Sequence, residues 1–93
     1  MKKYLPVGSI VLLKNTKKRV MVIGYKPKIV GDDKIWDYSG CPFPEGVIDA
    51  HKLFVFNDNQ IDKLFFIGLQ DTDSMTFLKL LGEADSKKDD EIF

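Results

Sequence analysis

Cys41 and His51 are the two residues whose types could form a nucleophile and its general base, as in cysteine enzymes. The chain holds one cysteine and one histidine, so the presence of both is no evidence that they pair. Catalysis would also require a third group that orients the imidazole and an oxyanion site, and neither residue lies in a motif typical of cysteine enzymes. We therefore expect a structural thiol and a surface imidazole in a protein that is not an enzyme.

Metal and nucleotide sites find little support in the sequence. A structural zinc site takes four ligands, mostly cysteine and histidine, and this chain offers two such residues. The acidic and amide residues of 58–62 partly follow the pattern of a calcium loop, but Lys63 stands where such a loop needs glycine, so turn capping explains them better. Phosphate-binding glycine motifs are also missing from the sequence. We expect no cofactor and no metal.

The charged residues divide the chain into two unlike parts. Residues 1–30 carry eight Lys and Arg and no acidic residue, whereas the rest carries six Lys and all fourteen acidic residues. Lys17, Lys18 and Arg19 could therefore bind a phosphate backbone, as some small barrels do. The formal net charge of zero argues against nucleic acid as the partner. A docking surface for an acidic protein, or a loop neutralised by the acidic part, is the preferred interpretation.

Short apolar runs predict the strands that would position these residues. β-Branched and aromatic residues predict strands over 9–13, 19–25, 34–40, 53–56 and 64–69, the first two forming a hairpin across the polar loop 14–18. Within 34–40, Trp36 and Tyr38 would face inward. Gly24 is a candidate bulge. The stretch 41–46 contains two prolines and is expected to be an irregular loop.

A change to helical spacing after Gln70 predicts one helix, capped near Asp71 and stopping at Gly82. The expected fold is mainly β (α+β), a small curled antiparallel sheet or an SH3-like barrel of about five strands with a C-terminal helix. An open α+β sheet is the alternative. Residues 1–82 would form a single domain, and the charged residues 83–93 a flexible tail.

The cysteine content and the apolar runs bear on location. One cysteine cannot form an internal disulfide, which favours a reducing compartment. The longest N-terminal apolar run, residues 10–13, is too short for a signal peptide or a membrane span. We expect a cytoplasmic protein that does not insert into the membrane.

Consecutive apolar residues predict an exposed patch on geometric grounds. In the segments 53–56 and 64–69, neighbouring side chains of a strand must point to opposite faces of the sheet. Unless the helix covers the outer face, some of these side chains are exposed and form a surface for a partner or for a second copy of the chain.

Several segments resemble a family of short domains of unknown function from Firmicutes, whose members are encoded beside type VII secretion genes and their LXG-type toxins. The resemblance spans Tyr4 to Asp71. Its most specific residues are Trp36, Asp37, Tyr38, Gly40, Cys41, Pro42, Pro44, Glu45, Gly46, Phe56, Asn57, Ile61 and Asp62.

The resemblance implies an accessory protein of the secretion system, an export chaperone or targeting adaptor whose partner is an LXG-type toxin or a secretion component. An immunity protein and a nucleic-acid-binding small barrel are the alternatives. The expected contact residues lie on the loop 40–46 with its flanking strand and on the basic hairpin: Trp36, Tyr38, Cys41, Pro42, Phe43, Pro44, Glu45, Lys17, Lys18 and Arg19. A structural role for Trp36, Tyr38 and the prolines is an equal alternative.

Overall fold

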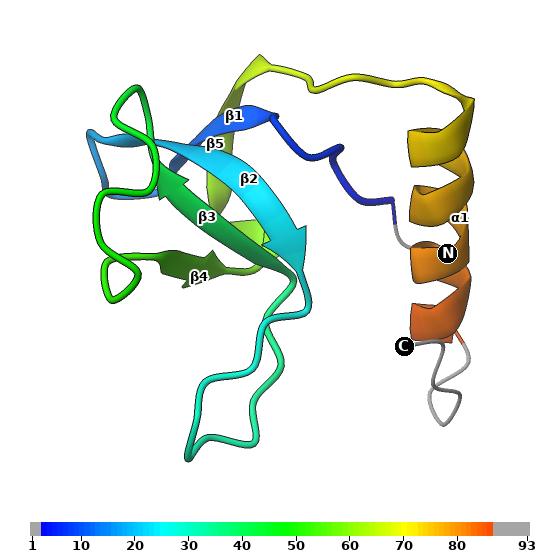
Figure 1. Cartoon of the computed structure of the whole chain (residues 1–93), viewed down its shortest axis with the longest axis horizontal. Coiled ribbons are helices and arrows are strands. Elements are labelled where there is room, and N and C mark those ends of the chain that lie inside the picture. Colours follow the sequence, from blue (N-terminus) through cyan, green and yellow to red (C-terminus); the bar gives the residue numbers. More distant parts are fainter. Residues whose placement is uncertain (1–2, 87–93) are drawn as a thin grey trace.

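Five strands and one long helix make up residues 3–86, the part of the chain that this computed structural model describes. The elements are β1 (Ile10–Leu13), β2 (Arg19–Tyr25), β3 (Tyr38–Pro42), β4 (Phe54–Phe56), a one-turn 3-10 helix (Asp58–Gln60), β5 (Ile61–Phe66) and α1 (Thr72–Ser86). The strands pair antiparallel in one sheet of order β4-β3-β2-β1-β5, and α1 stands apart from it on one side (Figure 1). The predicted mainly β (α+β) fold is confirmed, as an open sheet with β4 and β5 at its edges.

The predicted hairpin is confirmed as the pair β1 and β2, which supplies the centre of the sheet. Val11 lies opposite Val20 in the register, and the two side chains are 0% and 2% exposed. The predicted irregularity at Gly24 is also present, because the pairing of β2 with β3 shifts register between Val22 and Gly24. A bulge of this kind bends the strand and increases its local twist.

β3 lies further along the chain than predicted, because Pro42 is compatible with the end of this strand. The pair Val20–Pro42 needs no bond from the proline nitrogen, since the next bond to β2 comes from Phe43 N–H to the Arg19 carbonyl at 3.0 Å. On the other side of β3, the pairing with β4 extends only as far as Gly40, so among residues 3–86 Pro42 has no partner strand there. The expectation that residues 41–46 form no regular structure was therefore wrong for Cys41 and Pro42.

The residues before β3 form a long loop instead of the predicted strand. Among the described residues, 26–37 contribute one isolated bridge, between Lys28 and Ile35. Lys26 has a φ of 51°, a left-handed conformation that turns the chain out of β2. Trp36 therefore lies in the loop, whereas Tyr38 is 0% exposed in β3, so that only one of the two aromatics predicted to face inward does so from a strand.

β5 also differs from its prediction, since it begins at Ile61 and ends at Phe66. Gly68 explains the end, because a Cβ atom there would lie 2.1 Å from the carbonyl oxygen of Val7. This close approach lets the Gly68 N–H donate to the Ser9 hydroxyl at 2.9 Å, and that hydroxyl donates to the Pro6 carbonyl at 2.7 Å. The chain leaving β5 is thereby tied to the N-terminal segment, residues 3–9.

α1 starts where the caps predicted it, with Asp71 Oδ1 accepting a bond from Ser74 N–H at 2.8 Å. It continues past Gly82, the predicted stop, to Ser86. Burial explains the extension, because Leu81 and Ala84 are 0% and 8% exposed and Leu81 belongs to the buried core cluster. The rest of the predicted tail, residues 87–93, lies outside the described residues.

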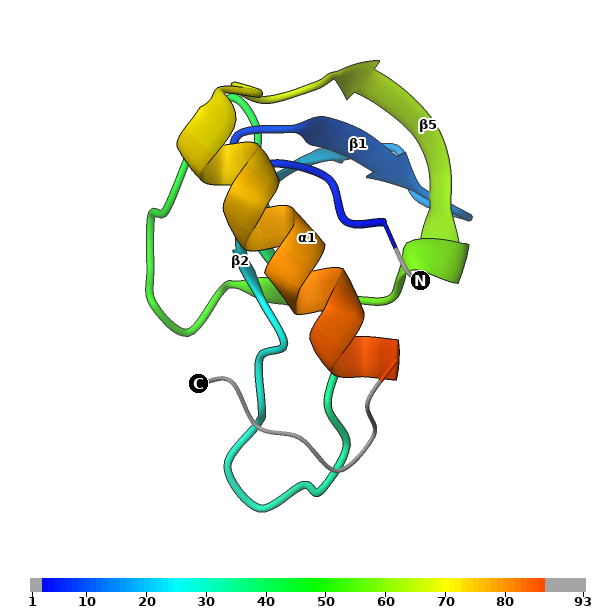
Figure 2. The ribbon, with the colours of Figure 1, turned by 90° about the vertical axis from the view of Figure 1, so that its right-hand side faces the viewer.

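The core lies between the sheet and α1 and includes the N-terminal segment. Figure 2 shows α1 crossing diagonally over one face, with residues 3–9 lying between it and the sheet. The buried cluster draws on all three layers and consists of Tyr4, Val11, Val20, Val22, Tyr38, Phe56, Leu78 and Leu81. Because residues 3–9 separate helix from sheet, α1 leaves part of β5 uncovered.

Candidate protein-binding surface

The basic hairpin and the proline-rich loop, both predicted contact segments, meet in the structure. The Lys18 ammonium contacts the Glu45 carboxylate at 2.5 to 2.6 Å, and this hydrogen bond lowers the pKa of Glu45. The Arg19 guanidinium lies over the Phe43 ring, 5.0 Å from its centre. Lys17, Lys18, Arg19, Pro44 and Glu45 are exposed, and Pro42 and Phe43 are partly buried. We call this region the loop–hairpin surface, defined by residues 17–19 and 42–45.

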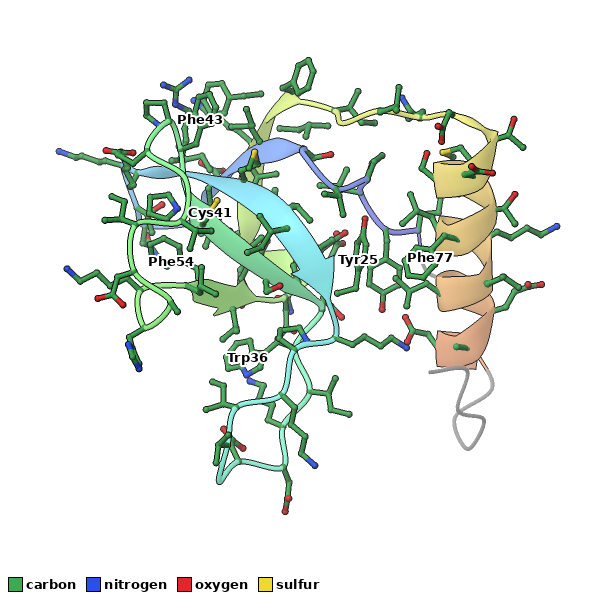
Figure 3. The ribbon with its side chains drawn as sticks, in the orientation of Figure 1. Tyr25, Trp36, Cys41, Phe43, Phe54 and Phe77 are labelled. Carbon is green, nitrogen blue, oxygen red and sulfur yellow. The ribbon has the colours of Figure 1, made fainter. Side chains whose placement is uncertain are left out.

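The other predicted contact residues do not join the loop–hairpin surface. Tyr38 and Cys41 are 0% exposed, so they serve the core, in agreement with the structural interpretation of this segment. Trp36 lies in the separate loop 26–37, well away from Phe43 (Figure 3). There the Lys34 ammonium lies 3.8 Å from the centre of the indole ring. The loop–hairpin surface is also remote from α1, on the opposite side of the molecule in Figure 3.

Cys41 and His51 lie in opposite environments. The Cys41 side chain is completely buried, whereas the His51 side chain is 95% exposed and its ring nitrogen contacts Asp49 at 3.2 Å. A buried thiol and a solvated imidazole do not share an accessible site for a substrate. Among residues 3–86, no group of three His, Cys, Asp or Glu side chains is placed to hold a metal ion.

Ion pairs join the basic N-terminal part to the acidic remainder of the chain. Lys18 pairs with Glu45, and Lys26 pairs with Asp85. These contacts agree with the interpretation that the two parts partly neutralise each other when folded.

A groove that no single segment of the sequence indicates lies between α1, β5 and the N-terminal segment. It has a volume of about 700 Å³. Its walls are mainly apolar and come from the N-terminal segment, from β5 with the residue after it, and from α1: Leu5, Ile61, Leu64, Ile67, Met75 and Leu78. Lys3, Lys79 and Asp58 supply the charged groups of the lining. An apolar groove with a few charged groups has the composition expected of a binding site.

β5 exposes apolar side chains beside this groove and on the other face of the sheet. Leu64, Phe65 and Phe66 are 50%, 52% and 58% exposed. Leu64 lines the groove, while Phe65 lies under Arg19, whose guanidinium is 5.7 Å from the ring centre. The predicted exposed patch at residues 64–69 is therefore present, and it extends to both faces of β5, because α1 lies on one side of the sheet only and leaves Leu64 half exposed there.

Tyrosine hydroxyls fix the N-terminal segment that forms the floor of the groove. The Tyr25 hydroxyl donates to the Leu5 carbonyl at 2.5 Å, and the Leu5 N–H donates to the Tyr38 hydroxyl at 2.9 Å. Burial raises the pKa of Tyr25 to about 12 and raises that of Tyr38 further. The Tyr25 ring also contacts α1, since the centres of the Tyr25 and Phe77 rings are 5.8 Å apart. The floor is thus held in one position before any partner binds.

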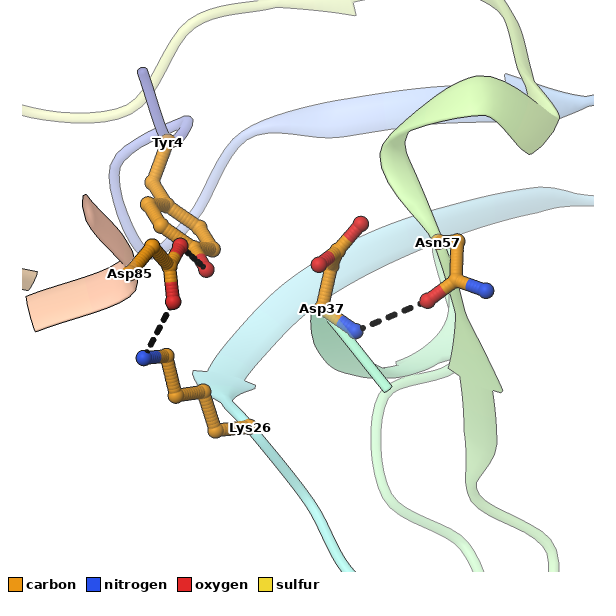
Figure 4. A network of polar contacts seen from close by, with 5 residues as sticks. All are labelled: Tyr4, Lys26, Asp37, Asn57 and Asp85. Carbon is orange, nitrogen blue, oxygen red and sulfur yellow. Dashed lines mark hydrogen bonds and ion pairs between the residues drawn. The ribbon is translucent and has the colours of Figure 1, made fainter. Parts of the chain in front are cut away.

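The Asp85 carboxylate on α1 also holds the N-terminal segment, at Tyr4. The Tyr4 hydroxyl donates to Asp85, which also pairs with Lys26 (Figure 4). Burial is the main cause that raises the pKa of Tyr4, and the bond to Asp85 adds to it.

A second polar link steadies the start of β5. Asn57 Oδ1 accepts a hydrogen bond from Asp37 N–H at 3.1 Å (Figure 4), and the Asp37 carboxylate accepts one from Asp58 N–H at 2.8 Å.

A family model for a domain of unknown function, DUF4176, matches residues 4–77. The chain belongs to this family. The match covers the whole sheet, the N-terminal segment from Tyr4 onward and the first part of α1, so that it includes most of the groove lining but not Lys3, Leu78 and Lys79. No curated protein and no solved structure matches the chain. Among the described residues, no helix is both long and apolar enough to span a bilayer.

Proposed function

We propose that this DUF4176 protein is a non-enzymatic accessory protein that binds another protein through the groove and the exposed face of β5. The observation that carries the proposal is the continuity of these two surfaces at Leu64, an apolar side chain that is half exposed. Exposure of such an apolar surface to water is unfavourable in free energy. A partner that buries the surface removes this unfavourable exposure.

The partner that we propose is an LXG-type toxin, or another component, of a type VII secretion system. This part of the proposal comes from the resemblance of the sequence to accessory proteins encoded beside such toxins. An export chaperone or targeting adaptor in the cytoplasm must recognise its cargo without altering it. A fixed apolar groove with a charged rim suits that task, because apolar contacts supply affinity and the charges supply orientation.

Co-purification of the tagged protein from its own host at moderate salt, followed by mass spectrometry, tests the proposal. Recovery of an LXG-type toxin is the expected result. Binding to the export domain of the toxin would support the adaptor role, whereas binding to the toxic domain, with protection of cells that express it, would replace that role by immunity. Failure to recover a toxin or a secretion component would contradict the proposal.

A further inference from the structure

We infer that the groove binds an amphipathic helix of the partner, one whose apolar ridge is flanked by carboxylates. The inference rests on the proposed function, since it names the segment that the same site would recognise. It draws on the shape of the groove walls, the irregular edge of β5 and the charges of the lining.

The wall formed by α1 has the spacing that another helix requires. Met75, Leu78 and Lys79 stand at positions i, i+3 and i+4 and therefore form a ridge along one side of α1. A second helix can lay its own ridge beside this one and contact Leu64 and Ile67 on the opposite wall. Met75 and Leu64 are 45% and 50% exposed, so both have apolar surface left to bury.

The alternative of an added strand is disfavoured by the shape of β5. The pairing of β5 with β1 shifts register twice, between Ile10 and Val11 and between Leu12 and Leu13. Bulges twist an edge strand and interrupt the row of backbone groups that a new strand would use. The side chains of β5, more than its backbone, are therefore the part available for contact.

The charges of the lining select the polar residues of the bound helix. Lys3 and Lys79 are exposed, and neither forms an ion pair with another residue of 3–86, whereas Asp58 is the acidic member of the lining. The excess of positive charge favours a ligand that places glutamate or aspartate beside its apolar ridge. A lysine-flanked ridge would be repelled by the same two ammonium groups.

Synthetic peptides test the inference directly. The probe is a labelled amphipathic helix with a leucine ridge flanked by glutamates, and its binding is followed by fluorescence anisotropy. Two control peptides have lysines in place of the glutamates, or a proline in the middle that prevents helix formation. We expect the glutamate peptide to bind at least about tenfold more tightly than either control at low salt. Equal binding of the proline peptide would overturn the helix assignment in favour of an extended segment.

Paired variants locate the binding site. Met75→Gln with Leu64→Gln removes two apolar side chains from the groove, and we expect it to weaken peptide binding about tenfold. The matched control, Leu80→Gln with Val30→Gln, removes two exposed apolar side chains outside the lining, which are 46% and 101% exposed. Unchanged binding in the groove variant, or equal loss in the control variant, would overturn the inference.

A charge reversal adds a test that misfolding cannot imitate. Lys79→Glu should lower the affinity for the glutamate peptide and raise the affinity for the lysine peptide, each by about threefold to tenfold at low salt. The absence of this exchange would overturn the proposed flanking carboxylates. Self-association of the free chain that is abolished by the groove variant would show that a second copy occupies the site and would likewise overturn the inference.

The inference and the proposed function fail in different ways. Recovery of an LXG-type toxin from the host in equal amounts with the wild type and with the groove variant would support the function and contradict the groove as its site. Peptide binding without recovery of a toxin or secretion component would support the helix-binding groove and contradict the secretion partner.

Discussion

The hydroxyl of Tyr4 donates a hydrogen bond to the carboxylate of Asp85, and this contact joins the N-terminal segment to the last turn of α1. Lys26, which follows β2, pairs with the same carboxylate. Three segments distant in sequence therefore meet at one side chain. The contact ties α1 to the N-terminal segment, and both of these elements line the groove.

Removal of the Tyr4 hydroxyl should loosen this contact. Tyr4→Phe keeps the ring in the core and removes the hydrogen bond from the hydroxyl to Asp85, so we expect a loss of about 1 to 2 kcal/mol in the free energy of unfolding, measured by urea denaturation. Asp85→Ala should cost more, since it removes the hydrogen bond and the ion pair together. Wild-type stability in both variants would contradict the role assigned to this contact.

Alkaline pH should destabilise the fold through its buried tyrosines. Burial raises the pKa of Tyr25 from 10.0 to about 12, so above pH 10 the unfolded chain loses this proton while the folded chain keeps it. The stability that depends on this shift is present in full below pH 10 and is lost as the pH rises toward 12. We expect the melting temperature to fall over this range. Tyr25→Phe should have a lower melting temperature at neutral pH and a shallower fall, and an identical slope in the two proteins would refute the assignment.

A methyl group at Gly68 should disturb the exit from β5. The added Cβ atom would meet the carbonyl oxygen of Val7, a backbone atom that cannot move aside without shifting the N-terminal segment. We expect Gly68→Ala to reduce the free energy of unfolding by about 2 kcal/mol. Leu69→Ala is the neighbouring control, because this side chain is 73% exposed, and its effect should stay within about 0.5 kcal/mol. Equal effects of the two substitutions would contradict the close approach at Gly68.

The Cys41 thiol should be unreactive while the protein is folded. Its side chain is 0% exposed in β3, so a disulfide reagent in solution cannot reach the sulfur atom. The expected observation is a slow release of the coloured thiol product from the native protein and a rapid, complete release in urea. A fast stoichiometric reaction under native conditions would contradict the burial and would reopen the possibility of a reactive cysteine.

Local patterns in the sequence were sufficient for the central elements. The apolar run around Val11 and the one around Val22 predict the paired strands at the middle of the sheet, and Gly24 predicts the bulge between β2 and β3. The bounds of β3 and β5 were misjudged for reasons that depend on neighbours. Pro42 is tolerated because β4 ends before it, and β5 stops because Gly68 packs against Val7.

The candidate site was predictable only in part. The segment 64–69 indicated an exposed apolar patch because consecutive large side chains cannot all face one side of a strand. The groove was not predictable, since Lys3, Leu64 and Met75 come from separate segments and their meeting depends on where α1 crosses the sheet. The contact between Lys18 and Glu45 likewise depends on the fold, although the sequence indicates each residue separately as a contact candidate.

The most direct test of the account is the recovery of an LXG-type toxin from the host with three tagged proteins: the wild type, Met75→Gln with Leu64→Gln, and the control Leu80→Gln with Val30→Gln. The account predicts that the wild type and the control retain the toxin and that the groove variant loses most of it, with melting temperatures that match across the three proteins. Retention of the toxin by the groove variant, or its absence from the wild-type sample, would contradict the account.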